Sequence, residues 1–306
     1  MKTPRILVVG SSNTDMIIKL DRIPRPGETI LGGAFVTAAG GKGANQAVGA
    51  ARAGGQVTFI ARVGQDMFGD QAVAGFATDG INVDHVSRDK TNPSGVALIF
   101  VAKDGENSIA VAGGANAKLS PADVRKAKAA FADASVLVMQ LETPLESVQA
   151  AADLAVKDGV RVILNPAPAQ PLPDKLLKCV SILTPNETEA ELLTGIAVTD
   201  TASAAVAAAK LRARGVQTVI ITLGARGSFV ATESGGQLVS GFKVEAVDTT
   251  AAGDIFNGAL AVALAEGKPL DQAVRFGHAA AAISVTRLGA QPSAPTRREI
   301  EKFLKI

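Results

Sequence analysis

Short apolar runs recur along the chain, and most of them end at Gly, Asn or an acidic residue. They are RILVVG (5–10), VTFIARVG (57–64), SVLVMQLE (135–142), VRVILNPAP (160–168), VSILTPNE (180–187) and TVIITLG (218–224). Runs of this kind predict buried strands of a parallel sheet. Helical stretches such as ASAAVAAAKLRARG lie between them. The alternation predicts an α/β fold with three layers, α/β/α, around a central, mostly parallel sheet.

Two segments depart from this alternation. Residues 14–37 and 94–111 have the pattern of antiparallel strands, with turns at PRPG and KDGEN. We expect them to form one small β-sheet near the carboxyl end of the first strand, where it would act as a lid; the alternative is two unrelated hairpins. Helices are predicted over 253–266, 270–286 and 296–304, and residues 1–306 are expected to form a single α/β domain with the lid segments inserted.

Composition excludes several classes of protein. The 306 residues carry a formal net charge of +2 without a Lys/Arg run, so a nucleic-acid partner is not expected. The single Cys179 excludes an intramolecular disulfide, and two His residues exclude a multi-His metal site. The N-terminal apolar run is too short for a signal peptide, and no apolar run reaches the roughly 18 residues of a membrane span. We therefore expect a cytoplasmic protein without membrane contact.

Polar residues follow the predicted strands at their carboxyl ends. Ligands of open α/β sheets bind at this edge, so the shared position predicts one common site. The polar residues at or just past strand ends are Asn13, Asp15, Glu142, Asn165, Asn186, Thr222 and Asp248, the last after the apolar stretch 244–247.

The glycine-rich stretch GGKGAN (40–45) allows close approach of the backbone to a ligand, and Asn45 can pair with hydroxyl groups. It is neither a Walker A loop nor GxGxxG, because Gln46 holds the last position. A carboxylate and an amide at Asp15 and Asn13 suit a polyol, and Glu142 adds an acceptor. Taken singly, these residues also fit ordinary turns and a carboxylate near a helix N-terminus.

Two further motifs follow predicted strands. NETE (186–189) places Asn186 and Glu189 three residues apart at a helix start, which fits a capping box and also an approach to phosphate and hydrated magnesium. TLGARG (222–227) is a turn after a strand, with a plain hairpin as the alternative.

DTTAAGD (248–254) puts a carboxylate at the start of a helix behind small residues. Backbone N–H groups at a helix start favour an anion. Phosphoryl transfer needs such donors, and it needs a carboxylate near the attacking hydroxyl. We therefore interpret Ala251, Ala252 and Gly253 as donors and Asp254 as the proton acceptor, although a helix N-cap alone would also explain Asp254.

Together these motifs resemble the ribokinase family of PfkB-type carbohydrate kinases, over nearly the whole chain. AAGD and the NxxE of NETE are shared across the wider family, whereas GGKGAN, MQLE and NPAPA are more specific to ribokinases. The matching stretches are GSSNTD, PRPGET, GGKGANQAV, SGVALIFV, GENSI, MQLETPLESV, LNPAPA, LTPNETEAELLTG, VIITLGARG, AVDTTAAGDIFNGAL and VTRLGAQPS.

The resemblance implies transfer of the γ-phosphate of ATP to O5 of D-ribose. It implies that Asp254 is the base and that the amides of Ala252 and Gly253 form an anion hole. Glu189 would act on Mg²⁺ through water. Ribose contacts would be Asn13, Asp15, Gly41, Lys42, Gly43, Asn45, Glu142 and Asp254. ATP contacts would be Asn186, Thr222, Leu223, Gly224, Ala225, Gly227, Gly253 and His278. A K⁺ ion would lie near Asp248, Thr250, Ser284, Arg287, Gly289 and Ser293.

The resemblance also implies a homodimer formed through the lid segments. Alternatives stay open at this point. One is a kinase of the same family for another sugar or a nucleoside. A second is a sugar-binding protein without catalysis, against which the intact AAGD speaks. A third is an NAD-dependent oxidoreductase, against which the missing GxGxxG speaks.

Overall fold

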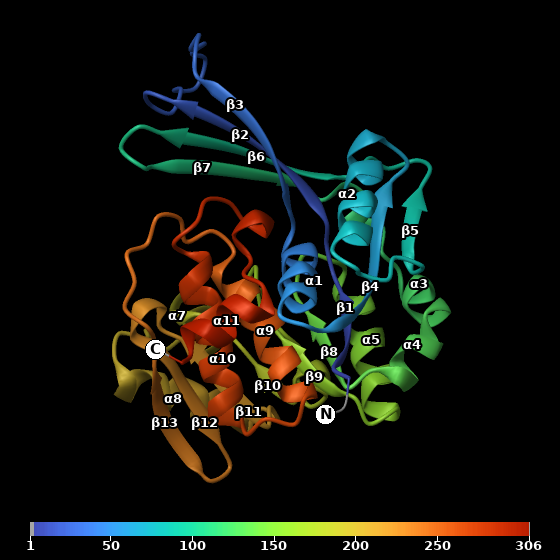
Figure 1. Ribbon diagram of the computed structural model, residues 1–306, viewed down its shortest axis with the longest axis vertical. Coiled ribbons are helices and arrows are strands. Elements are labelled where there is room, and N and C mark those ends of the chain that lie inside the picture. Colours follow the sequence, from blue (N-terminus) through green and yellow to red (C-terminus); the bar gives the residue numbers. More distant parts are fainter. Residues whose placement is uncertain (1–2, 306) are drawn as a thin grey trace.

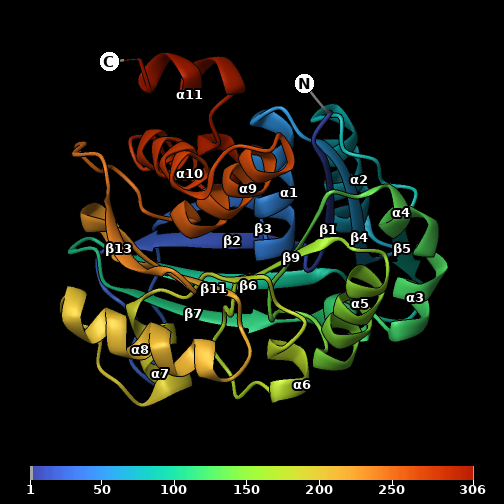
Figure 2. The ribbon, with the colours of Figure 1, turned by 90° about the horizontal axis from the view of Figure 1, so that it is seen from below.

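In the computed structural model, which describes residues 3–305, a nine-stranded sheet runs through the centre of the molecule in the order β13-β12-β11-β10-β9-β8-β1-β4-β5 (Figures 1 and 2). Neighbours from β11 to β5 are parallel, and β12 and β13 pair antiparallel at one edge. The strands are β1 (Arg5–Val9), β4 (Gln56–Gly64), β5 (Val86–Asp89), β8 (Val136–Met139), β9 (Arg161–Leu164), β10 (Ile182–Leu183), β11 (Thr218–Thr222), β12 (Gly227–Thr232) and β13 (Gly235–Ser240).

Helices cover both faces of this sheet, as Figure 2 shows. One core lies between the sheet and α1 (Lys42–Arg52), α2 (Met67–Thr78), α9 (Ala252–Ala265), α10 (Leu270–Ser284) and α11 (Arg297–Phe303). A second core lies on the other face under α3 (Pro121–Lys126), α4 (Lys128–Asp133), α5 (Leu145–Lys157), α6 (Asp174–Leu177), α7 (Glu187–Thr194) and α8 (Thr201–Ala213). The predicted α/β/α layers are confirmed.

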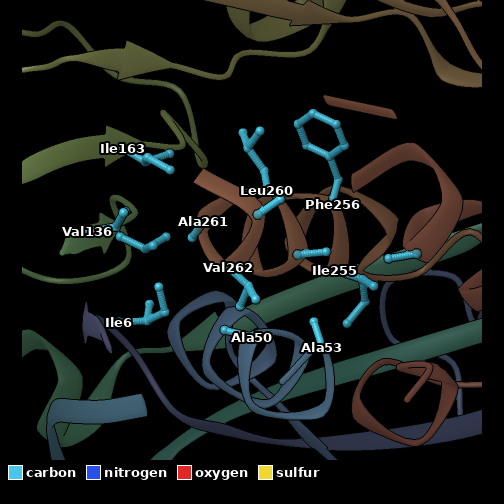
Figure 3. Packing of buried hydrophobic residues seen from close by; sticks show 14 of the residues in the cluster. Ile6, Ala50, Ala53, Val136, Ile163, Ile255, Phe256, Leu260, Ala261 and Val262 are labelled. Atoms are coloured by element: carbon cyan, nitrogen blue, oxygen red, sulfur yellow. The ribbon is translucent and has the colours of Figure 1, made fainter. Parts of the chain in front are cut away.

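Helix α9 is the central helix of the first face. Its residues from Asp254 to Leu264 are all buried, and Figure 3 shows Leu260, Ala261 and Val262 facing the strand residues Ile6, Val136 and Ile163. Helix α1 packs against the same helix. A helix buried on all sides has little freedom to shift, so the residues of its first turn are held in fixed positions.

The two departing segments pair with each other in a separate sheet of the described chain, ordered β3-β2-β6-β7 (upper part of Figure 1). Strands β2 (Asn13–Leu20) and β3 (Ala34–Gly40) are antiparallel, and so are β6 (Gly95–Ala102) and β7 (Asn107–Ala112). The two pairs join through β2 and β6, which are parallel. The small sheet is therefore confirmed, with strands reaching to residues 13, 40 and 112.

Asp248 does not end a strand. Residues 241–251 contain no strand, and Val247 is 60% exposed. The apolar stretch 244–247 has no neighbouring strand to pair with, so the pattern that predicted one there was wrong. Similarly, Asn13 and Asp15 do not follow β1 in a turn but form the beginning of β2.

No helix within residues 3–305 is long and apolar enough to span a membrane.

Candidate active site

Three helix N-termini and the carboxyl ends of β8, β9 and β10 meet at one edge of the central sheet. Helices α1, α7 and α9 begin there, and Lys42, the first residue of α1, is approached by Glu189 of α7 and Asp254 of α9. Helix N-termini present unpaired N–H groups and a partial positive charge. The edge is therefore suited to an anionic ligand.

Glycines determine how α1 begins. Gly41 has φ 90°, the left-handed region, and a Cβ there would lie 2.7 Å from the backbone nitrogen of Asn13. The amide of Lys42 donates to Glu142 Oε2 at 3.0 Å, and the hydroxyl of Ser11 donates to the same oxygen at 2.5 Å. Glu142 thus accepts hydrogen bonds at the start of α1 and not at the helix that follows it in sequence, and its role as a sugar acceptor stays a prediction.

Asp254 is buried in the first turn of α9, and two amide side chains bind it. Asn45 Nδ2 donates to Oδ2 at 3.0 Å and Gln46 Nε2 donates to Oδ1 at 2.9 Å. The N-cap of α9 is Ala251, at φ 59°, so Asp254 is the third residue of the helix and not its cap. Helix capping therefore does not explain why an aspartate stands at position 254.

The loop before α9 adopts a strained conformation, since Ala251 is the one residue other than glycine with positive φ within residues 3–305. The amide of Ala252 donates to Thr249 O at 3.2 Å and closes the turn. No acceptor within residues 3–305 receives the amide of Gly253, which is exposed. The anion hole of Ala252 and Gly253 stays a prediction, with Gly253 the better oriented of the two.

Lys42 lies among four carboxylates. Burial would lower the pKa of Lys42, but Asp254, Glu142, Glu189 and Asp15 together raise it above its usual value. Burial raises the pKa of Asp254 and of Glu189, and burial with the nearby Glu142 raises the pKa of Asp15 to about 6. These charges come from β2, the loop after β8, α7 and α9, so the structure brings the predicted sugar-side and nucleotide-side residues into one electrostatic cluster.

On the sugar side, Asn13 has a fixed orientation. Asn116, in the 3₁₀ turn after β7, donates its Nδ2 to Asn13 Oδ1 at 2.7 Å. The Asn13 amide nitrogen is therefore the end left for a ligand. Asp15, on the same strand, lies against Gly40, where a Cβ would come within 2.3 Å of its carboxylate oxygens.

On the nucleotide side, the NETE and TLGARG motifs lie side by side. Asn186 forms a parallel bridge with Thr222, and the amide of Thr222 donates to Pro185 O at 2.9 Å. Asn186 and Glu189 form the predicted capping box of α7. The segment 222–227 is the β11–β12 connection, with Gly224, Ala225 and Arg226 exposed.

His278 lies behind this connection and not on its surface. It is 8% exposed, its Nε2 is 2.7 Å from Ser228 Oγ, and its ring is 5.3 Å from that of Phe256. Burial lowers the pKa of His278 to about 4. Contacts with Ser228 and Phe256 explain why His278 is buried in the core. The predicted contact of His278 with ATP stays a prediction, and the geometry does not support it.

The predicted cation ligands come from two neighbouring loops that Asp248 joins. Its carboxylate accepts the amides of Thr250 and Gly289 at 2.9 and 2.8 Å. Ser284 and Ser293 are buried, and each hydroxyl donates to the main chain. The guanidinium of Arg287 pairs with Glu299, so this residue has only its carbonyl oxygen to offer. All of the available donors are oxygen atoms, which fits a hard cation.

Sequence reasoning missed several polar residues that hold the site. All are buried, and they are Ser11, Gln46, Asn116, Gln140, Thr184 and Asn257. Gln140 and Thr184 directly follow β8 and β10, so the rule that found Asn165 would have found these two as well. Asn257 and Gln46 lie on helices, where an isolated amide carries no signal.

Comparisons with known proteins identify the family to which this fold belongs. The model of the pfkB family carbohydrate kinases matches residues 3–297. The ribokinase of Haemophilus influenzae is 51% identical over 98% of each chain, and a deoxyribokinase of Salmonella typhi is 37% identical over 98% of this chain and 99% of its own. The structure of Arabidopsis thaliana ribokinase complexed with ribose and ATP superimposes with a TM-score of 0.93, at 36% identity over 99% of each chain.

The chain belongs to the pfkB family of carbohydrate kinases.

Proposed function

We propose that the protein is an ATP-dependent kinase that converts D-ribose to D-ribose 5-phosphate. Ribokinases at 40–51% identity and the ribose–ATP complex of the Arabidopsis enzyme support this activity. The observation that carries it is the cluster around Lys42, where the acceptors Asp15 and Glu142 on the sugar side meet Glu189 on the nucleotide side, with buried Asp254 beside them.

In the proposed mechanism, Asp254 accepts the proton of the O5 hydroxyl. A bond forms between O5 and the γ-phosphorus, while the bond from that phosphorus to the β–γ bridging oxygen breaks and leaves ADP. Lys42 and the amide of Gly253 stabilise the charge that develops on the transferred group. Asn13, Asp15, Glu142 and Asn45 orient the sugar. The raised pKa of Asp254 suits a group that must take up a proton at this moment.

ADP release measured with ATP and magnesium over a panel of sugars tests the substrate. The panel contains ribose, 2-deoxyribose, arabinose, xylose, fructose, adenosine and no sugar. We expect the highest kcat/KM with ribose. A preference for 2-deoxyribose, the substrate named by the Salmonella relative, or for another member would leave the mechanism in place and change the substrate. No release with any member would contradict the kinase.

Asp15 gives sugar binding a specific pH dependence. Its pKa is about 6, and only the ionised carboxylate accepts hydrogen bonds on both oxygens. Ribose affinity should therefore be constant above pH 7 and fall roughly tenfold for each unit below about 6. Calorimetric titration without ATP measures this independently of Asp254 chemistry. Asp15→Asn should bind more weakly with a flat profile, whereas a flat wild-type profile from pH 5 to 8 would contradict the role of Asp15.

Magnesium enters the proposal with ATP. Glu189 uses Oε2 to accept the amide of Asn186 at 2.9 Å, so its second oxygen suits a water of hydrated Mg²⁺. Among residues 3–305, no group of three His, Cys, Asp or Glu side chains is placed to hold a metal ion. Most ligands of the ion would accordingly be phosphate oxygens and water, and its charge would offset that of the phosphates.

A potassium ion between the Asp248 loop and the segment 284–293 is the second proposed ion. Its charge would support the dipoles of the loop that precedes α9. Exchange of potassium for sodium at constant ionic strength should lower kcat severalfold, because the smaller ion fits the same oxygens poorly. Equal rates in both salts would remove the proposal.

We also propose a homodimer formed through the lid, on the face that carries Asp15. Directly paired residues share a face, and Val36, Ile17, Ile99 and Ile109 form one apolar row across the lid sheet. Val36 is 47% and Ile109 is 55% exposed. Such a row is typical of an interaction surface.

Ile109→Asp should therefore produce a monomer in sedimentation velocity, since it buries a charge at the proposed interface. Ser108→Asp, its exposed neighbour on the opposite face of β7, is the matched control and should remain dimeric. A dimeric Ile109→Asp variant would contradict this interface. The absence of nucleic-acid and membrane partners and the cytoplasmic location remain predictions.

A further inference from the structure

A chain of buried amide side chains connects Asp254 to the carboxyl ends of β8, β9 and β10. Gln46 is its centre and is 0% exposed. Its Nε2 donates to Asp254 Oδ1 at 2.9 Å and to Asn165 Oδ1 at 3.1 Å, and its Oε1 accepts Gln140 Nε2 at 2.6 Å. Asn165 in turn donates its Nδ2 to the carbonyl of Thr184 at 3.1 Å.

The direction of this chain is fixed at one end by the backbone. A carbonyl only accepts, so Asn165 must turn its nitrogen to Thr184 and its oxygen to Gln46. Gln46 must then face Asn165 with its nitrogen, which is also the end that reaches Asp254. Each amide has one donor and one acceptor end, so a single backbone acceptor determines that Asp254 meets a donor.

The orientation of these amides leaves one polar atom of Gln140 without a hydrogen bond. Its Oε1 is buried and finds no donor within residues 3–305, while its nitrogen binds Gln46. Turning the Gln140 amide around would place its oxygen against that of Gln46. Space for the side chain exists because residue 10 is a glycine, where a Cβ would lie 2.2 Å from Gln140 Oε1. A buried acceptor without a donor destabilises the fold, so the arrangement favours the orientation of Gln46 at the expense of Gln140.

A second branch starts at the same threonine and reaches the residue before Asp254. The hydroxyl of Thr184 donates to Asn257 Oδ1 at 2.8 Å, and Asn257 Nδ2 donates to Gly253 O at 2.8 Å. Both the carboxylate and the first turn of α9 are thus held from Thr184, two residues before Asn186 of the nucleotide side.

From this geometry we propose that Gln46 is a positioning residue that keeps Asp254 ionised and aimed at the sugar, with its own orientation imposed by Asn165 and Gln140. The proposal rests on the proposed role of Asp254 as base. Hydrogen bonds to the charged form of a carboxylate favour that form and oppose the effect of burial. Removing the donor should therefore change the protonation of Asp254 as well as its position.

Gln46→Glu tests this, because it keeps the shape and replaces the donor with an oxygen. The two carboxyl groups would share a proton, so the acid limb of kcat, measured at saturating ribose so that binding through Asp15 does not contribute, should move up by about one pH unit or more. Lys42 and Glu142, the other charged groups that act on Asp254, are unchanged in this variant. Activity at pH 7 should fall at least about tenfold. Gln149→Glu is the matched control: Gln149 also donates to an aspartate, Asp153 at 2.8 Å, but on α5, and the profile should not move.

Gln140→Glu provides a second variant in case Gln46→Glu fails to fold, since residue 140 touches neither Asp254 nor the sugar in the proposed mechanism. Its new oxygen would face Gln46 Oε1 and favour the reversed Gln46 amide, so the acid limb should move in the same direction by a smaller amount. An unmoved acid limb in folded Gln46→Glu or Gln140→Glu protein would overturn the proposal, because a merely structural role changes stability and not the pH profile.

Melting temperatures test the contact between Gln46 and Asp254 without relying on the role of Asp254 as base. Gln46→Glu should lower the melting temperature at pH 8, and Asp254→Asn in the same chain should restore most of the loss by giving the carboxylate introduced at position 46 a donor. Additive losses would overturn the contact. Wild-type turnover in the Asp254→Asn single variant would instead refute the proposed function while leaving this coupling measurable.

Discussion

Asp254→Asn is expected to reduce kcat by roughly a hundredfold to ten-thousandfold while ribose and ATP still bind. The asparagine has the same shape and retains an acceptor for the amide of Gln46 at Oδ1. It cannot take the proton from O5. The carboxylate is buried, and Asn45 and Gln46 hold it from both sides, so its position is fixed in the folded protein.

Single-turnover rates together with equilibrium binding of ribose measure this prediction. The melting temperature is the control, since burial raises the pKa of Asp254 and its neutral replacement should not destabilise the fold strongly. Near wild-type turnover with intact binding would show that the proton leaves by another route. A loss of binding alone would indicate that Asp254 orients the sugar and does not act as a base.

The layered fold could be predicted from the sequence because its signals are local. The central residues of runs such as RILVVG and TVIITLG, 6–9 and 219–221, are buried on both faces and are all apolar. The stretch 244–247 before Asp248 is less apolar, because it contains Glu245, and the structure forms no strand there. The pairing of β2 with β6 is a contact between distant segments, and only their common departure from the alternation indicated it.

For the site, too, the sequence indicated some of the residues and not others. Glycine-rich and acidic motifs identified residues that the structure gathers in one cluster and that we propose to face the ligand, such as Lys42 and Asp254. The residues behind them were missed, because a buried amide has no characteristic spacing. Gln46 had been noted only as the residue that breaks a GxGxxG motif. Its role depends on the three-dimensional position of Asn165 and Gln140, which lie 119 and 94 residues away in sequence.

Gly43→Ala is expected to have the second largest effect, through the position of α1. A Cβ at residue 43 would lie 2.4 Å from the backbone nitrogen of Ser11 and 2.6 Å from the carbonyl carbon of Gly10. Backbone atoms cannot rotate away as side chains do, so the first turn of α1 must move. The Lys42 amide would then lose Glu142, and the contact of Asn45 with Asp254 would lengthen.

We expect kcat/KM for ribose to fall more than about a hundredfold, since misplacement by about 1 Å has effects of this size. Stability should fall by about 1–3 kcal/mol, the usual cost of overpacking. Gly75→Ala is the matched control: this glycine lies within α2, and a Cβ there meets nothing within 4 Å. Alanine should stabilise that helix by about 0.5–1 kcal/mol without altering activity. If Gly43→Ala kept wild-type kcat/KM as the control does, close packing of α1 on the segment 10–11 would not position the site.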